Sequence, residues 1–387
     1  MCAKLTTSKK TDMQSSSKTD LYYIHLYNDF SGSPRVLRDA IDSEVHQSQQ
    51  TYVFTSKHKG FLDGAAAQRV NCFYARSNNK YLQLFYFLIA QFFIFVKLFS
   101  YLVSGAIQGR KAIVIINTML PFGAAIAAKL LARQVIYYVH ETYITPESLK
   151  LFLRFFIEHC ASHVIFVSKY LALQERFIKP HQEVIYNGLR SDFPVIQDVD
   201  YRFKFSNKQL FFAGSLKSYK GVDKLVKIAN ALPTFKVVAA VNCTQQELDG
   251  FISQYKPPSN MHILIRPKNI HEHFAASFLV LNLSDVEHCV ETFGLSLIEG
   301  MATGSPVVAP PVGGPTEFVN KYNGLLINAE RVAKIIEFIN YLNSSEAIWQ
   351  RFAKQAYLDA QSFTSVQFKI TFKDYAIRHE FIAELHH

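Results

Sequence analysis

The chain has 387 residues, of which 49% are hydrophobic, and it carries a net charge of +10. This length is too great for one typical core and predicts two domains of about 150 to 200 residues each. The positive charge favours an anionic partner such as nucleic acid, acidic lipid or a phosphorylated substrate. The five cysteines are widely spaced without a C-x-x-C pair, so neither a disulfide framework nor a zinc site is indicated, and a reducing cytoplasm fits.

The N-terminal segment, residues 1–20, is polar and rich in Ser, Thr and Lys. It lacks the apolar core of a signal peptide and predicts a disordered tail. Residues 21–27 are mostly apolar and predict the first buried strand. A loop with Gly32 and Ser33 follows, and these small residues would let a ligand approach the backbone closely. The same sequence could equally form a plain turn before a helix.

An unusual apolar segment lies between predicted strands at residues 51–55 and 112–117. Residues 81–106 are almost wholly apolar and aromatic, with few polar interruptions. Three interpretations stay open: a buried helix of an α/β domain, a helix docked at a membrane interface, and a transmembrane span. A span is disfavoured because it needs about 20 predominantly apolar residues and tolerates a central charge such as Lys97 poorly.

The docked interpretation predicts a cytoplasmic protein that is peripheral on the inner face of the plasma membrane. The apolar run at residues 84–96 is shorter than a bilayer crossing, and its aromatic rings could enter the headgroup layer. The basic residues that could meet anionic lipid are Arg76, Lys80, Lys97, Arg110 and Lys111.

Another predicted strand, at residues 135–139, leads directly into His140 and Glu141. Ligands of an open parallel sheet gather at the carboxyl ends of its strands, so His140 is a candidate substrate contact, although a lone histidine is commonly structural. Glu141 could contact an acceptor or begin a helix. Downstream, Asp198 and Asp200 form a D-x-D pair in linker sequence without a preceding strand, so a metal site is not indicated there.

The second domain begins with a predicted strand at residues 209–213. Gly214 and Ser215 follow it, and then Lys217 and Lys220 precede a helix. Glycine at a strand end with lysine at the next helix start suits a phosphate site.

The most informative stretch runs from Glu291 to Glu299. Its central residues, 293–295, predict the start of a helix that ends at Gly304. The free N–H groups and the positive dipole end of that helix would face a phosphate. Eight helical positions span roughly 12 Å, so the two carboxylates could accept hydrogen bonds from opposite ends of one nucleotide sugar. The alternative is an ordinary helix whose glutamates are solvated.

This stretch, with Gly313-Gly314-Pro-Thr-Glu317 and Asn323-Gly324 downstream, resembles the donor-binding signature of retaining glycosyltransferases of the GT-B fold, family 4. The resemblance covers about residues 21–375 and is most specific at residues 209–327. It implies an α/β fold of two Rossmann-like βαβ domains that face a central cleft. It also implies a bacterial enzyme of cell-surface polysaccharide, capsule or lipopolysaccharide biosynthesis.

The implied chain organisation has four parts. After the tail, residues 21–197 would form an N-terminal acceptor domain, and residues 198–362 would form a nucleotide-sugar donor domain. Residues 363–387 would form C-terminal helices that return to the first domain.

The resemblance implies roles for individual residues. Glu291 would bind donor sugar hydroxyls and support positive charge at the anomeric carbon, and Glu299 would hold the ribose. Lys220 would stabilise the leaving pyrophosphate, and His140 would face the donor sugar. The other implied donor contacts are Phe293, Gly294, Leu295, Gly32, Ser33, Gly214, Ser215, Lys217, Arg266 and Ile270.

One residue departs from the resembled pattern. Family members usually read Gly-Arg-Leu where this chain has Gly214-Ser215-Leu216. Loss of that cation implies either weaker donor binding or neutralisation of the pyrophosphate by helix ends or by Lys217.

We therefore expect transfer of a hexose-type sugar from a nucleoside diphosphate sugar (UDP, GDP or another) to a glycan or lipid-linked acceptor, with retention and without metal or cofactor. One alternative is another GT-B enzyme, such as a nucleotide-sugar epimerase or a phosphorylase, but no motif supports the pyridoxal phosphate lysine of a phosphorylase. The other is a basic nucleic-acid-binding protein. That class predicts basic residues clustered with aromatic residues, whereas the lysines here are dispersed.

Overall fold

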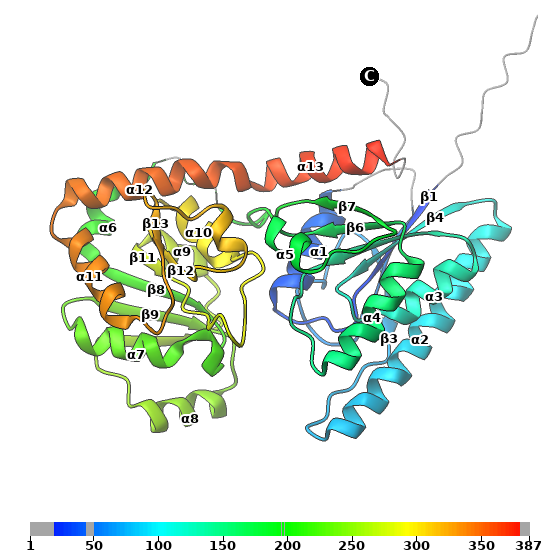
Figure 1. Ribbon diagram of the computed structural model, residues 1–387, viewed down its shortest axis with the longest axis horizontal. Coiled ribbons are helices and arrows are strands. Elements are labelled where there is room, and N and C mark those ends of the chain that lie inside the picture. Colours follow the sequence, from blue (N-terminus) through cyan, green and yellow to red (C-terminus); the bar gives the residue numbers. More distant parts are fainter. Residues whose placement is uncertain (1–18, 44–49, 195, 197, 380–387) are drawn as a thin grey trace, which may run out of the picture.

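The computed structural model describes residues 19–43, 50–194, 196 and 198–379. Two parallel sheets, each covered by helices, form two domains side by side (Figure 1). Strands buried on both faces read as unbroken apolar runs, which is why most of them were predictable. The first sheet has the order β3-β2-β1-β4-β5-β6-β7. Its strands are β1 (Thr19–Ile24), β2 (Thr51–Ser56), β3 (Gln68–Cys72), β4 (Lys111–Asn117), β5 (Gln134–Val139), β6 (His163–Phe166) and β7 (His181–Val184).

Helices of the first domain connect these strands. They are α1 (Gly32–Ser43), α2 (Lys80–Ile107), α3 (Phe122–Leu130), α4 (Glu147–Cys160) and α5 (Lys169–Gln174). The 28-residue α2 packs on α3, which in turn packs on α4. In Figure 1, α2 crosses the first domain diagonally and only its C-terminal end reaches the side away from the second domain.

The second sheet has the order β10-β9-β8-β11-β12-β13. Its strands are β8 (Gln209–Gly214), β9 (Lys236–Val241), β10 (Met261–Ile265), β11 (Ser277–Leu281), β12 (Val307–Ala309) and β13 (Gly324–Leu326). Its helices are α6 (Tyr201–Asn207), α7 (Val222–Ala231), α8 (Gln245–Tyr255), α9 (Ile270–Ala275), α10 (Leu295–Ala302), α11 (Val332–Asn343) and α12 (Glu346–Ala360). Trp349 of α12 is fully buried and donates its indole N–H to the carbonyl of Phe278 at 2.8 Å.

The last helix, α13 (Ser365–Arg378), continues from α12 across the top of the molecule to the first domain (Figure 1). Its apolar side chains Phe368, Phe372 and Tyr375 are buried in the core of the first domain. The prediction that a C-terminal helix returns to the first domain is confirmed. Any helix that includes Phe381, Ile382 and Leu385 lies outside the described residues.

One carboxylate of the second domain accepts hydrogen bonds from groups of the first domain. Glu317, from the Gly-Gly-Pro-Thr-Glu segment, accepts hydrogen bonds from the backbone N–H groups of Lys169 and Tyr170 at 3.1 and 2.7 Å. These groups lie in the first turn of α5, where N–H groups have no partner within the helix. Tyr186 of the first domain also donates its hydroxyl to Glu317, at 2.7 Å.

Several boundaries in the structure differ from those predicted from the sequence. Thr19 and Asp20 belong to β1 instead of the tail, and residues 1–18 lie outside the described part. Strand β3 was not predicted because its sequence, QRVNC, has no apolar run. Asp200 caps α6 by accepting from the N–H of Phe203 at 2.9 Å, which gives this carboxylate a structural role. The predicted boundary at residues 197 and 198 falls between β7 and α6 and stays a prediction.

Candidate functional site

The largest set of predicted site residues surrounds a cavity of about 450 Å³ between the two domains. Ten of the predicted site residues line this cavity: Glu291, Glu299, His140, Lys220, Phe293, Gly294, Leu295, Gly32, Ser33 and Ile270. These residues follow carboxyl ends of strands in both sheets, because parallel strands direct their following loops to one edge. The cavity is therefore built jointly by the two sheets.

A second cavity, of about 670 Å³, adjoins the first and includes Gly214, Ser215 and Arg266. The two cavities share residues from both domains, and two of these carry positive charge: Lys220 of the second domain and Arg190 of the first. A ligand that filled both cavities would pass both of these cations. A ligand with an anionic centre and one further part on each side of it fits this arrangement.

Lys217 is the one predicted site residue that lines neither of these two cavities. Its side chain is exposed and its Nζ lies 3.3 Å from Glu247 of α8, beside a separate cavity. The turn after β8 directs Lys217 toward α8 and directs Lys220, three residues later, toward the shared region. The proposal that Lys217 could replace the family arginine has no geometric support in this conformation.

Lys220 and Glu291 form an ion pair in the first cavity. The Lys220 Nζ lies 3.0 Å from the Glu291 Oε2, which also accepts from the Asn282 amide at 3.0 Å. Burial alone would lower the pKa of Lys220, but the Glu291 carboxylate more than offsets this and raises it. Burial likewise opposes ionisation of Glu291, yet Lys220 and Asn282 hold its pKa below the usual value. Both groups are therefore charged at neutral pH.

Helix α10 begins directly after Glu291 and its loop. Gly294 caps the helix with φ of 103°, a left-handed conformation that favours glycine. Because the helix begins at Leu295, Glu291 lies in the loop before it and Glu299 lies about one turn inside it, as predicted. The helical rise used for the 12 Å span applies only from Leu295 onward. Phe293 is buried beside Phe318 and Phe363. Only its backbone can meet a ligand.

Glu299 is paired with arginines of the first domain. The Arg35 Nη1 donates to the Glu299 Oε1 at 3.0 Å, and the Arg190 Nε lies 3.6 Å from the same oxygen. Glu299 is only 6% exposed, so the expected ribose contact would require this ion pair to rearrange. Burial lowers the pKa of Arg35, partly offset by Glu299. Its Nε and Nη2 have no hydrogen-bond partner among the described residues, which leaves two buried donor nitrogens at the cavity wall.

Sequence reasoning did not single out Arg35 or Arg190. A signal for Arg35 was present, because it lies next to the buried stripe of α1 (Val36, Leu37 and Ala40), where a cation needs a partner. Gly32 and Ser33 form the first turn of this helix instead of a preceding loop, and this places Arg35 on the cavity side. Arg190 follows the Asn187-Gly188 turn beyond β7, but no local pattern indicated that it would cross to Glu299.

His140 is held in a network of buried polar groups. Its Nε2 lies 2.7 Å from the Asn117 Oδ1, while the Asn117 amide nitrogen lies 3.0 Å from the His25 Nδ1 and 3.1 Å from the Ser33 carbonyl. Burial and the neighbouring His25 lower the pKa of His140 to about 3. The ring is therefore neutral, with the proton on Nε2 donated to Asn117. The Nδ1 atom then remains as an acceptor for a ligand hydroxyl.

Glu141 lines the same cavity and is also affected by burial, which raises its pKa to about 7. A carboxyl group in an unfolded chain titrates near 4.3, so between these values the native state holds a proton that the unfolded state has lost. The free energy of unfolding must then fall as pH rises through this interval.

We expect Glu141→Gln to remove this pH dependence. The variant should have the same Tm as the wild type at pH 4 and a higher Tm at pH 8, because glutamine has no charge to bury. Thermal unfolding at both pH values measures the difference. An equal Tm difference at pH 4 and pH 8 would contradict the burial of an ionisable Glu141.

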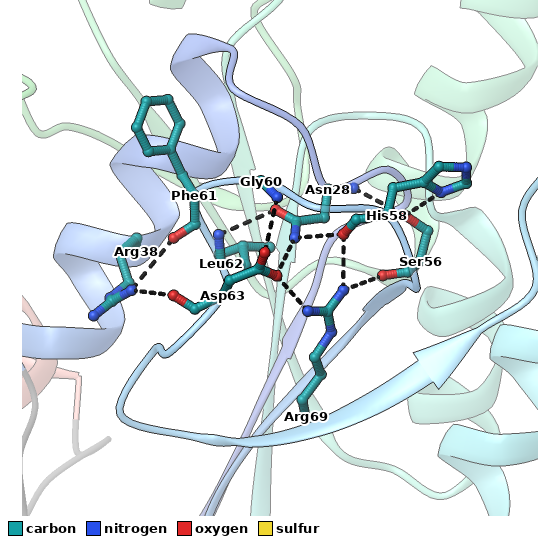
Figure 2. A network of polar contacts seen from close by, with 9 residues as sticks. All are labelled: Asn28, Arg38, Ser56, His58, Gly60, Phe61, Leu62, Asp63 and Arg69. Atoms are coloured by element: carbon teal, nitrogen blue, oxygen red, sulfur yellow. Dashed lines mark hydrogen bonds and ion pairs between the residues drawn. The ribbon is translucent and has the colours of Figure 1, made fainter. Parts of the chain in front are cut away.

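The loop after β2 is fixed by a polar network that positions Phe61 at both cavities (Figure 2). Asn28 is fully buried; its amide donates to the Asp63 carboxylate at 2.9 Å and its carbonyl accepts from the N–H of Leu62 at 3.0 Å. Arg69 of β3 contacts Asp63, and Arg38 of α1 donates to the carbonyl of Asp63 at 2.8 Å. The network thus ties the loop to a helix and a strand.

The described residues offer little support for a metal at the cavity. Asp285 accepts from the N–H of Glu287 and contacts the His288 ring, so this loop is held by its own hydrogen bonds. The group with metal-ligating spacing, His181, Glu183 and His379, lies where β7 meets the end of α13. Arg378 already contacts Glu183 there. The expectation of metal independence stays a prediction.

The sequence of the second domain matches a known family. Residues 197–359 match Glycosyl transferases group 1. An uncharacterized glycosyltransferase from Methanocaldococcus jannaschii is 29% identical over 198 residues, which cover 48% of this chain and 53% of that protein. A D-inositol 3-phosphate glycosyltransferase from Mycobacteroides abscessus is 28% identical over 137 residues, 34% of this chain and 31% of that protein. The matched regions therefore span about half or less of these curated relatives.

Solved structures establish the fold over nearly the whole chain. Anabaena HepE in complex with UDP-glucose superposes with a TM-score of 0.73 at 20% identity and covers 92% of this chain and 98% of that one. Sucrose-phosphate synthase from Thermosynechococcus elongatus superposes with a TM-score of 0.72 at 15% identity, over 95% and 100% of the two chains. The fold is the GT-B fold, so this prediction is confirmed.

Proposed function

We propose that this chain is a glycosyltransferase, on the premise that its second domain belongs to the family Glycosyl transferases group 1 and that both domains together have the GT-B fold. The donor would be a nucleoside diphosphate sugar, as in the UDP-glucose complex of Anabaena HepE. The observation that carries this proposal is that two adjoining cavities share the cations Lys220 and Arg190. A nucleoside diphosphate sugar has three matching parts: a sugar for one cavity, a nucleoside for the other, and a diphosphate for the region that they share.

The sugar would lie in the cavity that contains Glu291 and His140, and the nucleoside in the cavity that contains Arg266. Lys220 lies 3.0 Å from Glu291 and is shared by both cavities. It can therefore neutralise charge that develops on the departing diphosphate. Glu291 would then support positive charge at the anomeric carbon.

The transfer would retain the anomeric configuration. The acceptor hydroxyl oxygen bonds to the anomeric carbon as the bond to the diphosphate oxygen breaks on the same face, and the departing phosphate oxygen takes the acceptor proton. This route needs no enzymic base. The state of His140 agrees with a route without an enzymic base, because its Nε2–H is donated to Asn117 and its pKa is about 3. The second carboxylate, Glu299, is bound by arginines and is not presented as a nucleophile.

Metal independence and donor identity can be tested together. A panel of nucleoside diphosphate sugars is screened for release of nucleoside diphosphate, with and without EDTA. We expect one donor class to turn over in both conditions, because Lys220 and helix α10 would supply the charge stabilisation. Loss of turnover in EDTA that magnesium or manganese restores would overturn metal independence, and absence of turnover or binding with every donor would overturn the proposed activity.

Arg190 can supply the second diphosphate cation that Ser215 does not. Arg190 lines both cavities, as Lys220 does, and its Nε lies 3.3 Å from the Asp192 Oδ1 and 3.6 Å from the Glu299 Oε1. Donor ribose hydroxyls that engage Glu299 would release Arg190 toward the diphosphate. The first domain would thereby bind the donor and close the cavity.

Arg190→Ala should raise the donor KM by roughly tenfold or more, since a charge-assisted hydrogen bond contributes about 1.5–3 kcal/mol. Adding Ser215→Arg to this variant should recover much of the affinity, because it restores a cation on the second-domain wall. Initial-rate kinetics and nucleotide titrations measure both effects. If Ser215→Arg improves donor binding equally in the wild type and in Arg190→Ala, the two positions do not share one function.

A further inference from the structure

The first domain carries an apolar surface that the proposed reaction does not use. Only six of the 28 residues of α2 are buried: Phe87, Ala90, Gln91, Ile94, Leu98 and Leu102. Apart from the adjacent pair Ala90 and Gln91, they lie three or four residues apart and form the stripe that packs on the domain. The other face of a soluble helix at this position should be polar, yet here it is also apolar. Its exposed side chains include Tyr81, Leu82, Leu84, Phe85, Leu88, Phe92, Phe93 and Val96.

A second helix nearby also exposes apolar side chains. The ring centroid of Phe122, the first residue of α3, lies 5.9 Å from that of Phe87 of α2 and 5.1 Å from that of Phe152 of α4. Phe122 and Phe87 are each only 8% exposed, so this contact places the start of α3 between α2 and α4. Leu151, Phe152 and Phe155 of α4 are exposed, and we call these residues together with the exposed apolar side chains of α2 the α2–α4 face.

The exposed apolar residues of α2 lie mainly toward its start, in residues 81–96, and those of α4 lie near its middle, in residues 151–155. Helices α2 and α4 follow the loops at the carboxyl ends of β3 and β5. This is the edge of the sheet that also carries Gly32 and His140 of the cavity. The exposed start of α2 and the opening of the first domain's site thus lie at the same edge.

Positive charge borders this edge. Helix α2 contains no Asp or Glu, and its only charged residues are Lys80 and Lys97. The exposed cations Lys57 and Lys59 follow β2, exposed Arg76 lies between β3 and α2, and exposed Lys80 is the first residue of α2. Aromatic rings next to cations are the combination that favours an anionic bilayer surface.

By length and composition α2 could also cross a membrane. Its packing opposes this: the buried Gln91 Oε1 accepts from the N–H of Gly123 at 3.0 Å, and a Cβ on Gly123 would come within 2.3 Å of the Gln91 carbonyl oxygen. Helices α2 and α3 are therefore in close backbone contact. Crossing a bilayer would detach α2 from this interface and expose its buried stripe and a buried amide.

We propose that the α2–α4 face docks the protein onto an anionic lipid bilayer without crossing it, with the site edge facing the membrane. This inference rests on the proposed function in one respect: such an orientation suits a lipid-linked sugar as acceptor. Docking of α2 and α4 would hold the cavity near the headgroups, where the sugar of such an acceptor lies. The enzyme would then be peripheral on the leaflet that it contacts.

Flotation of the full chain with vesicles tests the docking. The probes are phosphatidylcholine vesicles and the same vesicles with phosphatidylglycerol. We expect binding only to the anionic vesicles and weaker binding in 0.5 M salt than in 0.1 M salt, since the Debye length shortens. Equal binding to neutral vesicles, or retention after a high-salt and carbonate wash, would overturn peripheral docking, and retention would indicate a span. Absence of binding to either vesicle would assign the face to a protein partner and overturn the proposal.

A matched pair of variants locates the surface. Phe85 and Phe92 are 55% and 63% exposed on α2, and Leu358 and Val366 are 61% and 63% exposed on α12 and α13. Phe85→Ser with Phe92→Ser should lower vesicle binding by roughly tenfold or more, whereas Leu358→Ser with Val366→Ser should not change it. Equal effects of the two double variants would overturn the assignment to α2.

Donor binding without vesicles separates this proposal from the proposed activity. The Phe85 and Phe92 variant should bind nucleoside diphosphate with the wild-type Kd and keep the wild-type Tm. Vesicle binding by a wild type that binds no donor would refute the activity and support docking. Donor turnover by a wild type that does not bind anionic vesicles would support the activity and refute docking.

Discussion

Replacing Glu291 with glutamine should lower kcat by roughly tenfold to a thousandfold, which corresponds to about 1.4 to 4 kcal/mol of lost charge stabilisation. The carboxylate lies 3.0 Å from the Lys220 Nζ and 3.0 Å from the Asn282 amide, so glutamine can occupy the same place without the charge. Under the proposed mechanism, positive charge at the anomeric carbon develops only in the transition state. The loss should therefore appear in kcat more than in donor KM.

Glu299→Gln is the matched comparison for this prediction. A ribose contact exists equally in the ground state and the transition state, so its loss should mostly raise the donor KM and leave kcat nearly unchanged. The variant also removes the partner of Arg35, whose Nη1 lies 3.0 Å from Glu299, so Tm must be measured alongside the kinetics. Small and equal effects of both glutamine variants on kcat and KM would refute the assignment of the two glutamates to the donor.

Replacing Lys220 with alanine should lower kcat/KM by roughly a hundredfold to a thousandfold, because the diphosphate loses a buried cation at the point where both cavities meet. The same change leaves Glu291 without the cation that holds its pKa below the usual value. We therefore expect the pKa of Glu291 to rise. The activity that remains should then depend on pH over a range where the wild type is constant.

A double variant shows whether this loss reflects one coupled pair. Lys220→Ala with Glu291→Gln should lose less activity than the sum of the two single effects, since either change already breaks the ion pair. Lys220→Met keeps the length of the side chain without its charge and separates packing from electrostatics. Additive losses in the double variant, with unchanged Tm, would mean that Lys220 and Glu291 act independently.

The α2–α4 face shows how the same residues supported several predictions until tertiary contacts were known. The sequence left α2 open as a buried, docked or spanning helix. The structure assigns one stripe of it to the domain core and leaves the other exposed. The contribution of Leu151, Phe152 and Phe155 was not foreseen, because α4 reads as an ordinary amphipathic helix. Only the packing of α2 and α4 on either side of α3 brings these residues near α2.

The sequence by itself determined the architecture and one half of the candidate site. Apolar runs marked most of the parallel strands, and Glu291 with Gly294 marked the start of α10, because strand burial and helix capping are local properties of the chain. Tertiary structure decided which distant charges meet. Glu299 pairs with Arg35, 264 positions away, and Lys220 meets Glu291 across 71 positions. The first pair depends on how the two sheets face each other, and the second depends on β8 and β11 being neighbours in one sheet. No local periodicity of the sequence encodes either arrangement.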